Sequence, residues 1–204
     1  MRSVPRWVLL SSGCAPVALI LGWLVAASLH GAAYDAAAQT ISVLAAPGGS
    51  GYWVMTTAFV VLGVCHLLTA WGLRPAATAG RVSLAAGGVA ALAVVLFPTA
   101  SSGGSLTHGW VAAAGFVLLA AWPLLAARTG DCVPWALRPL PAFGATAVMA
   151  GGAAWFLLEL RFRGVPGVAE RAVTTVQSVW PFLVALSCLR TTARARQPAG
   201  LVRR

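Results

Sequence analysis

Charged side chains are scarce in this chain of 204 residues, where they make up 9% of the sequence. An average soluble domain carries about a quarter. Hydrophobic residues make up 59%, so there is too little polar surface to cover a water-soluble globule. The composition therefore excludes an ordinary soluble domain and predicts an integral membrane protein. The length predicts a single transmembrane domain over residues 1–204.

Acidic residues are scarcer still, because there are only four of them against 14 basic residues, all of which are arginine. The net charge of +10 could suggest nucleic acid as a partner. Nucleic-acid binding needs a basic face interleaved with polar and aromatic residues. Here the arginines stand singly or in pairs at the ends of apolar runs. We therefore expect membrane topology, and not nucleic acid, to explain the charge.

Motifs for metals, cofactors and common nucleophiles are also absent. The four cysteines have no paired spacing, and the three histidines fall in different parts of the chain. There is no glycine-rich phosphate loop, no nucleophile elbow and no Asp-rich motif for a metal-bound diphosphate. The sequence thus predicts neither a metal site nor a cofactor.

Long apolar runs are what the sequence does contain. Since a membrane-spanning helix needs about 20 apolar residues, we predict six transmembrane helices. The first run is too long for the hydrophobic part of a signal peptide. None of the runs shows the period-two alternation of barrel strands, so the expected fold is an all-α membrane bundle. The predicted helices cover residues 7–29, 52–73, 82–98, 109–127, 141–160 and 172–189.

The arginines predict the orientation of this bundle. Eleven of them flank the runs on one side, and the other three, Arg161, Arg163 and Arg171, share one loop on the opposite side. The positive-inside rule places the eleven in the cytoplasm together with both termini. Residues 190–204 then form a basic cytoplasmic tail. We expect a multi-pass protein of a bacterial cytoplasmic membrane.

Three of the four acids, Asp35, Glu159 and Glu170, map to the outer side of the membrane. Ionisable groups near a membrane core are costly and tend to mark functional sites. Asp35 is placed to cap a short interfacial helix that carries Gln39 and ends before Pro47, or to aim its carboxyl into a cavity. Glu159 can form an ordinary ion pair with Arg163, four residues later.

A polar stripe follows the sixth predicted helix, where Glu170, Thr174 and Gln177 share one face. Such a stripe in an apolar helix should face the interior of the bundle. His108 begins the fourth helix on the same outer side. Outer aromatic residues are consistent with an interfacial belt, but aromatic faces also stabilise cations. They are Tyr34, Tyr52, Trp53, Trp110 and Trp155.

Short motifs stand near these residues: Tyr34-Asp35 with Gln39-Thr40-Ile41-Ser42 and Leu44, Phe97-Pro98-Thr99, His108-Gly109, and Gly167 with Glu170-Arg171. They resemble the bacterial membrane family called domain of unknown function 998. The resemblance covers nearly the whole chain and implies a six-helix fold but no activity. Where members often carry an acid after Phe-Pro-Thr, this chain has Ala100 and Ser101. The bundle is also similar, in architecture only, to small integral-membrane terpene cyclases.

Three functions fit this pattern. The first is a metal-independent intramembrane enzyme that acts on an isoprenoid or prenylated lipid by acid-initiated carbocation cyclisation. The second is a protein that binds or transports a lipid or a small apolar solute. The third is a structural membrane subunit. The sequence does not predict an oligomeric state. In the enzyme, a buried carboxyl that stays protonated would be the general acid and His108 would take the final proton. The candidate acids are Asp35, Glu159 and Glu170, and the candidate substrate-binding residues are Tyr34, Gln39, Trp53, Trp110, Trp155, Thr174 and Gln177.

Overall fold

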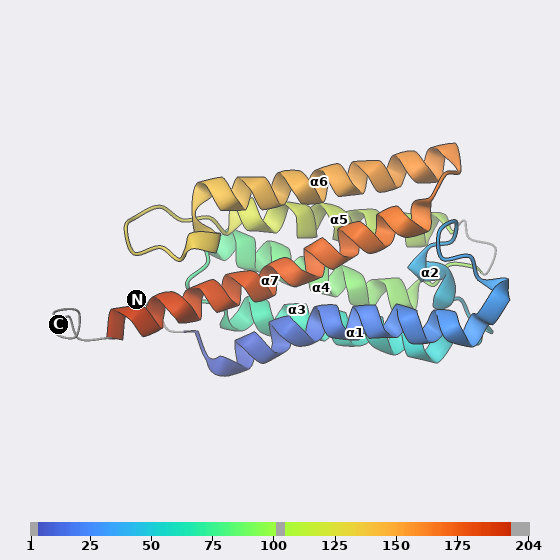
Figure 1. Ribbon diagram of the computed structural model, residues 1–204, viewed down its shortest axis with the longest axis horizontal. Coiled ribbons are helices and arrows are strands. Elements are labelled where there is room, and N and C mark those ends of the chain that lie inside the picture. The colour runs from blue at the N-terminus through green and yellow to red at the C-terminus, as the bar shows by residue number, and fades with distance from the viewer. Residues whose placement is uncertain (1–3, 101–104, 197–204) are drawn as a thin grey trace, which may run out of the picture.

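A computed structural model describes residues 4–100 and 105–196 of the chain (Figure 1). Ser101 and the last part of the predicted basic tail, residues 197–204, lie outside the described residues. Within the described part, every regular element is a helix, as the sequence predicted. The six long helices are all long and apolar enough to cross a membrane. The chain is therefore a multi-pass bundle.

The long helices are α1 (Arg6–His30), α3 (Tyr52–Gly72), α4 (Thr78–Leu96), α5 (Leu106–Leu125), α6 (Pro139–Phe162) and α7 (Pro166–Arg196). Three short elements join them: η1 (Gly31–Ala33), α2 (Ile41–Leu44) and η2 (Trp135–Leu137). A short helix follows α1 as predicted, but α2 has only one turn and begins at Ile41, so it does not carry Gln39 as expected.

The prediction for the sixth membrane helix was wrong at both ends. We expected residues 172–189, whereas α7 runs from Pro166 to Arg196. The apolar run stops at Glu170 and Arg171, but the helix continues through both residues because protein groups satisfy their side chains. Pro166 suits the first helical position, where no backbone N–H is needed. Glu170 therefore stands in the second turn of α7 and does not open the helix.

The six long helices form a closed ring. Each one packs against the next along the chain, and α7 returns to pack against α1. Figure 1 shows the start of α1 and the end of α7 at one end of the bundle and α2 at the other. By the positive-inside rule, we expect the end where α1 begins and α7 finishes to face the cytoplasm. We call it the cytoplasmic end, and the end with α2 the outer end.

Glycine brings α3 and α4 into backbone contact. A Cβ atom on Gly63 would lie 2.7 Å from the carbonyl oxygen of Gly88, and one on Gly88 would lie 2.8 Å from the carbonyl oxygen of Gly63. Small residues are the usual device for close helix packing in membranes, because hydrocarbon supplies no hydrophobic drive between helices. This contact fixes the wall of the bundle formed by these two helices.

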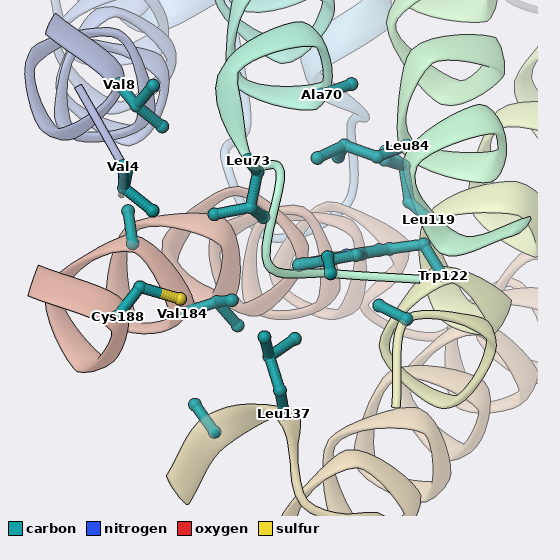
Figure 2. Packing of buried hydrophobic residues seen from close by; sticks show 14 residues of the cluster. Val4, Val8, Ala70, Leu73, Leu84, Leu119, Trp122, Leu137, Val184 and Cys188 are labelled. Atoms are coloured by element: carbon teal, nitrogen blue, oxygen red, sulfur yellow. The ribbon is translucent and has the colours of Figure 1, made fainter. Parts of the chain in front are cut away.

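Large side chains fill the interior at the cytoplasmic end. Figure 2 shows Trp122 in the middle of this cluster, with Leu73, Leu84 and Leu137 around it. Val184 of α7 belongs to the same cluster. Trp122 is fully buried. A pocket of about 750 Å³ at this end lies among the loops that carry Arg74 and Asp131, outside the cluster. The cavities between the helices that reach Glu170 lie toward the outer end.

The contact between Gly63 and Gly88 gives a stability prediction. Gly63→Ala should destabilise the protein by about 1–3 kcal/mol, because the added methyl group meets backbone that cannot move aside. The melting temperature of the protein in detergent measures this effect. Gly151→Ala is the control, since it is also in a helix and nothing lies within 4 Å of its Cβ position. Equal melting temperatures for the two variants would contradict the prediction.

Candidate functional site

The outer segment after α1 makes a tight turn at Asp35. Its Oδ1 atom accepts hydrogen bonds from the backbone N–H groups of Ala37, at 2.8 Å, and Ala38, at 3.3 Å. Residue 40, and not Asp35, holds the N-cap position of α2. The prediction that Asp35 caps the short helix was therefore wrong. Aspartate readily bonds the backbone two residues on, and this turn uses the exposed carboxyl locally.

Arg171 clamps this segment onto α7. Its Nη1 donates to the carbonyl oxygens of Ala36 and Gly167, both at 2.7 Å, and reaches that of Gln39 at 3.4 Å. Its Nη2 donates to the hydroxyl of Tyr34, and the guanidinium lies 5.6 Å from the centre of the Tyr34 ring. The fixed fork of a guanidinium suits such simultaneous contacts. Arg171 is thus committed to the outer segment.

Tyr34 completes the clamp as a buried hydrogen-bond donor. Its hydroxyl points to the carbonyl oxygens of Gln39 and Thr40, each 3.0 Å away. Burial raises the pKa of the Tyr34 phenol above its ordinary value, although Arg171 acts in the opposite direction. The hydroxyl therefore stays protonated and donates. Tyr34 supports the outer segment and does not line a cavity described here.

Gly167 allows the segment to approach α7. A Cβ atom at this position would lie 2.3 Å from the carbonyl oxygen of Gln39 and 2.4 Å from that of Ala36. The backbone N–H of Gly167 donates to the carbonyl oxygen of Ala37 at 2.9 Å. Only a residue without a side chain fits here, because the obstacle is backbone on the other segment.

Glu170 faces the interior from the same turn of α7. Its Oε2 accepts a hydrogen bond from the backbone N–H of Ile41 at 2.5 Å, and its Oε1 accepts one from the hydroxyl of Ser42 at 3.4 Å. The N–H of Ile41 is one of the donors that the start of a helix leaves without an intrahelical partner. The side chain of Glu170 is 4% exposed. Among the outer acids, this one is enclosed by protein.

A cavity of about 500 Å³ lies next to Glu170, between α5, α6, α7 and the segment before α2. We call it the outer cavity. It has mainly apolar walls that include Ala113 and Phe156, and its polar lining includes Gln39 and His108. Two further lining residues, Leu157 and Leu160, are 60% and 45% exposed on α6. The outer cavity therefore reaches the side of the bundle that faces lipid.

A smaller cavity of about 80 Å³ continues into the ring between α3, α4, α5 and α7. We call it the inner cavity. Thr174 and Gln177 line it, which confirms that the polar stripe of α7 faces the interior. The residues that line both cavities are Ser42, Ala112, Phe116 and Glu170. Glu170 thus stands where the two cavities meet.

His108 reaches the outer cavity from the first turn of α5. Its Nδ1 lies 2.9 Å from the carbonyl oxygen of Phe97. A carbonyl oxygen only accepts, so Nδ1 must carry the proton of this hydrogen bond. The hydrogen bond between His108 and Phe97 ties the segment after α4 to the start of α5. Thr99, two residues after Phe97, is buried and also lines the outer cavity.

The third outer acid, Glu159, serves the connection between α6 and α7. Its two oxygens accept hydrogen bonds from the indole N–H of Trp155 at 2.8 Å and from the backbone N–H of Val165 at 2.7 Å. Arg163 follows as the C-cap residue in a left-handed conformation, with φ of 53°. The predicted pairing of Glu159 with Arg163 is replaced by these contacts, and Glu159 does not line either cavity.

The tryptophans that we expected to wall a cavity face outward instead. Trp53, Trp110 and Trp155 are 75%, 76% and 38% exposed. Their outward position at the outer end fits an aromatic belt at the membrane interface. The aromatic rings that line the cavities are phenylalanines, and those of Phe116 and Phe156 lie 5.4 Å apart.

Sequence reasoning missed several lining residues. Phe116 and Phe156 sit within apolar helices, where no pattern separates a cavity wall from ordinary packing. Ala112 was missed for the same reason. Ser42 was named in the family motif but not among the candidate site residues, although it follows Gln39 and Thr40 in the sequence.

Comparison with known proteins supplies the family. The family described as protein of unknown function (DUF998) matches residues 14–187. The chain belongs to this family. No curated protein and no solved structure matches the chain.

The motifs that carry the resemblance to DUF998 come together in the fold. The segment from Tyr34 to Ser42 meets Gly167, Glu170 and Arg171, while the carbonyl oxygen of Phe97 meets His108. Members of both groups line the outer cavity. The residues that mark this chain as a DUF998 protein thus surround one site, which we take as the candidate functional site.

The Arg171 clamp gives a prediction about local stability. In Arg171→Gln, backbone amides of residues 36–43 should exchange hydrogen at least several-fold faster, because the contacts with the carbonyl oxygens of Ala36 and Gln39 and with the Tyr34 hydroxyl are lost and the segment opens locally. Hydrogen exchange measured by mass spectrometry in lipid nanodiscs tests this. Arg161→Gln removes an exposed arginine of the same end and is the control. Unchanged exchange in Arg171→Gln would show that the clamp contributes nothing.

Proposed function

We propose that this DUF998 protein binds an amphipathic molecule of the membrane, a lipid or an isoprenoid, in the outer cavity with the polar end of the molecule at Glu170. The observation that carries the proposal is the enclosed carboxyl of Glu170 at the junction of two cavities with mainly apolar walls. Ligand sites are typically apolar pockets with a few well-placed polar groups. A buried ionisable group in a membrane bundle is a functional candidate by default.

The size and opening of the outer cavity support this proposal. Its volume of about 500 Å³ falls within the range of small-molecule sites, roughly 300–1,000 Å³. The exposed leucines of α6, Leu157 and Leu160, line it, so an apolar chain can extend from the cavity into surrounding lipid. A ligand held in this way enters from the side, and its apolar part never has to cross water.

The filled cytoplasmic end favours binding over passage through the bundle. The cluster around Trp122 occupies the interior beyond the inner cavity, with Leu84 and Leu119 beside it. A polar solute crossing the ring would have to displace these side chains. The same argument favours a site that opens to one leaflet.

A pair of matched variants tests the proposal. Ala112→Phe should reduce the amount of lipid that copurifies with the protein by at least about tenfold, because the added ring occupies the junction of the cavities. Mass spectrometry of extracts from protein purified in mild detergent gives the amount. The control is Ala114→Phe, which adds the same ring to an exposed position of α5 outside both cavities. Equal lipid content in the two variants would count against binding in these cavities.

Acid-initiated chemistry on an isoprenoid is the second candidate. The observation that favours it is that the neighbouring rings of Phe116 and Phe156 line the outer cavity together with Glu170, because aromatic faces stabilise cations. Glu170 would protonate an olefin or epoxide, and His108 would accept the proton that the final cation loses. Asp35 and Glu159 have no part in this scheme, since their oxygens serve local turns.

Turnover decides between the two candidates. If the protein is an enzyme, purified protein in nanodiscs should convert a linear isoprenoid epoxide into cyclic product. Glu170→Gln should lower that rate at least about 100-fold, within the range that general acids contribute, whereas Glu159→Gln should leave it unchanged. Gas chromatography with mass detection measures the product. If the unmodified protein binds the isoprenoid but forms no product, the enzyme candidate is excluded and only the binding function remains.

A further inference from the structure

The hydrogen bonds around the two cavities determine which polar groups remain for a ligand. His108 uses its Nδ1 proton on the carbonyl oxygen of Phe97. In the neutral ring, its Nε2 is then a lone pair that can only accept a hydrogen bond. His108 is buried and lines the outer cavity. Its contribution to a ligand is therefore an acceptor.

The stripe on α7 offers acceptors as well. The side-chain amide of Gln177 donates to the carbonyl oxygen of Phe116 at 3.0 Å, which fixes the orientation of the amide and leaves Oε1 to accept. The hydroxyl proton of Thr174 is used on the carbonyl oxygen of Glu170 at 2.7 Å. The side-chain oxygen of Gln177 and the hydroxyl oxygen of Thr174 can therefore accept hydrogen bonds that a ligand donates, and Gln177 keeps its second amide N–H.

The charged groups near the two cavities also disfavour an anionic ligand. Both side-chain oxygens of Glu170 accept hydrogen bonds, from Ile41 and Ser42, as those of a carboxylate do, and no arginine is found among the described residues that line the two cavities. The neighbouring Arg171 uses its guanidinium on Tyr34 and the carbonyl oxygens of the outer segment. A phosphate or carboxylate placed next to Glu170 would meet a like charge in a poorly hydrated space, without the guanidinium fork that usually binds such anions.

On the basis of the binding function proposed above, we propose that the ligand carries a neutral or cationic head group that donates hydrogen bonds, a hydroxyl or an amine, and not a phosphate or a carboxylate. The O–H or N–H of the head donates to Glu170, and an amine has further N–H groups for His108 in the outer cavity or Gln177 in the inner cavity. The apolar chain fills the outer cavity and leaves past Leu157. An alcohol satisfies the carboxylate by hydrogen bonding alone, and an ammonium group also balances its charge.

A series of ligands with one tail and different heads tests this. Farnesol, farnesylamine, farnesoic acid and farnesyl monophosphate share the same isoprenoid chain, so only the head differs. Their dissociation constants are measured by calorimetry on the full chain in neutral lipid nanodiscs. We expect the alcohol or the amine to bind at least about tenfold more tightly than the acid and the phosphate, equivalent to about 1.4 kcal/mol.

Two variants separate failure of the head-group assignment from failure of the binding function. Ala112→Phe should abolish binding of every ligand that the unmodified protein binds, whereas Ala114→Phe should not. Glu170→Gln should remove the tenfold discrimination, because the carboxylate charge is lost while the amide oxygen can still accept from Ile41.

The outcomes are distinct. Tighter binding of the acid or the phosphate, if blocked by Ala112→Phe, would overturn the head-group assignment and leave the binding function standing. Absence of binding by all four ligands, or binding insensitive to Ala112→Phe, would overturn both. Discrimination that survives unchanged in Glu170→Gln would show that Glu170 does not select the head group.

Discussion

The hydrogen bond from the backbone N–H of Ile41 to the carboxylate of Glu170 joins two parts of the chain that are 129 residues apart. It gives the start of α2 the acceptor that a helix start lacks, and it holds the carboxylate in the interior of the bundle. The neighbouring residue, Arg171, binds the carbonyl oxygens of Ala36 and Gln39 in the same outer segment. Two adjacent residues of α7, one acidic and one basic, therefore dock the outer segment.

This arrangement explains why charges persist so deep in an apolar chain. A buried carboxylate without partners is strongly unfavourable, and in this bundle backbone and hydroxyl donors offset part of that penalty. The remaining acceptor capacity of Glu170 is directed to the cavities. The outer segment is thus both a lid held by α7 and the source of the donors that make an interior acid tolerable. The outer segment fills both roles through the same hydrogen bonds to α7.

The fold could be predicted from the sequence because bilayer thickness and the lack of water set the length and type of each element. The inward face of Glu170, Thr174 and Gln177 followed from helical period alone. The role of Asp35 did not, because an aspartate before a short helix can cap either the helix or its own turn. The ends of α7 were missed since hydropathy treats Glu170 as the edge of a helix, although tertiary contacts satisfy it inside one.

The walls of the site were beyond sequence reasoning for a related reason. In a bundle where nearly every residue is apolar, hydrophobicity does not separate residues that face lipid from residues that face a cavity. Tryptophan was a misleading guide, because a large ring with one polar atom is suited both to a pocket and to the membrane interface. Trp110 and Phe116 lie on the same helix, and only their angular positions decide that the first faces outward while the second lines the cavities.

The location of the cavities follows from residue size along α4 and α5. Toward the outer end these helices face each other with Ala90 and Gly115, which lie close enough that a Cβ on Gly115 would be 3.2 Å from the Ala90 Cβ. Toward the cytoplasmic end, Leu84 and Trp122 fill the same interior. Small residues let the helix backbones approach while leaving little side-chain volume inside the ring, so space remains next to Glu170. The polar residue and the space that it faces are therefore linked: a carboxyl at the filled end would have no room for a ligand, and a cavity without Glu170 would have no charged group with which to orient one.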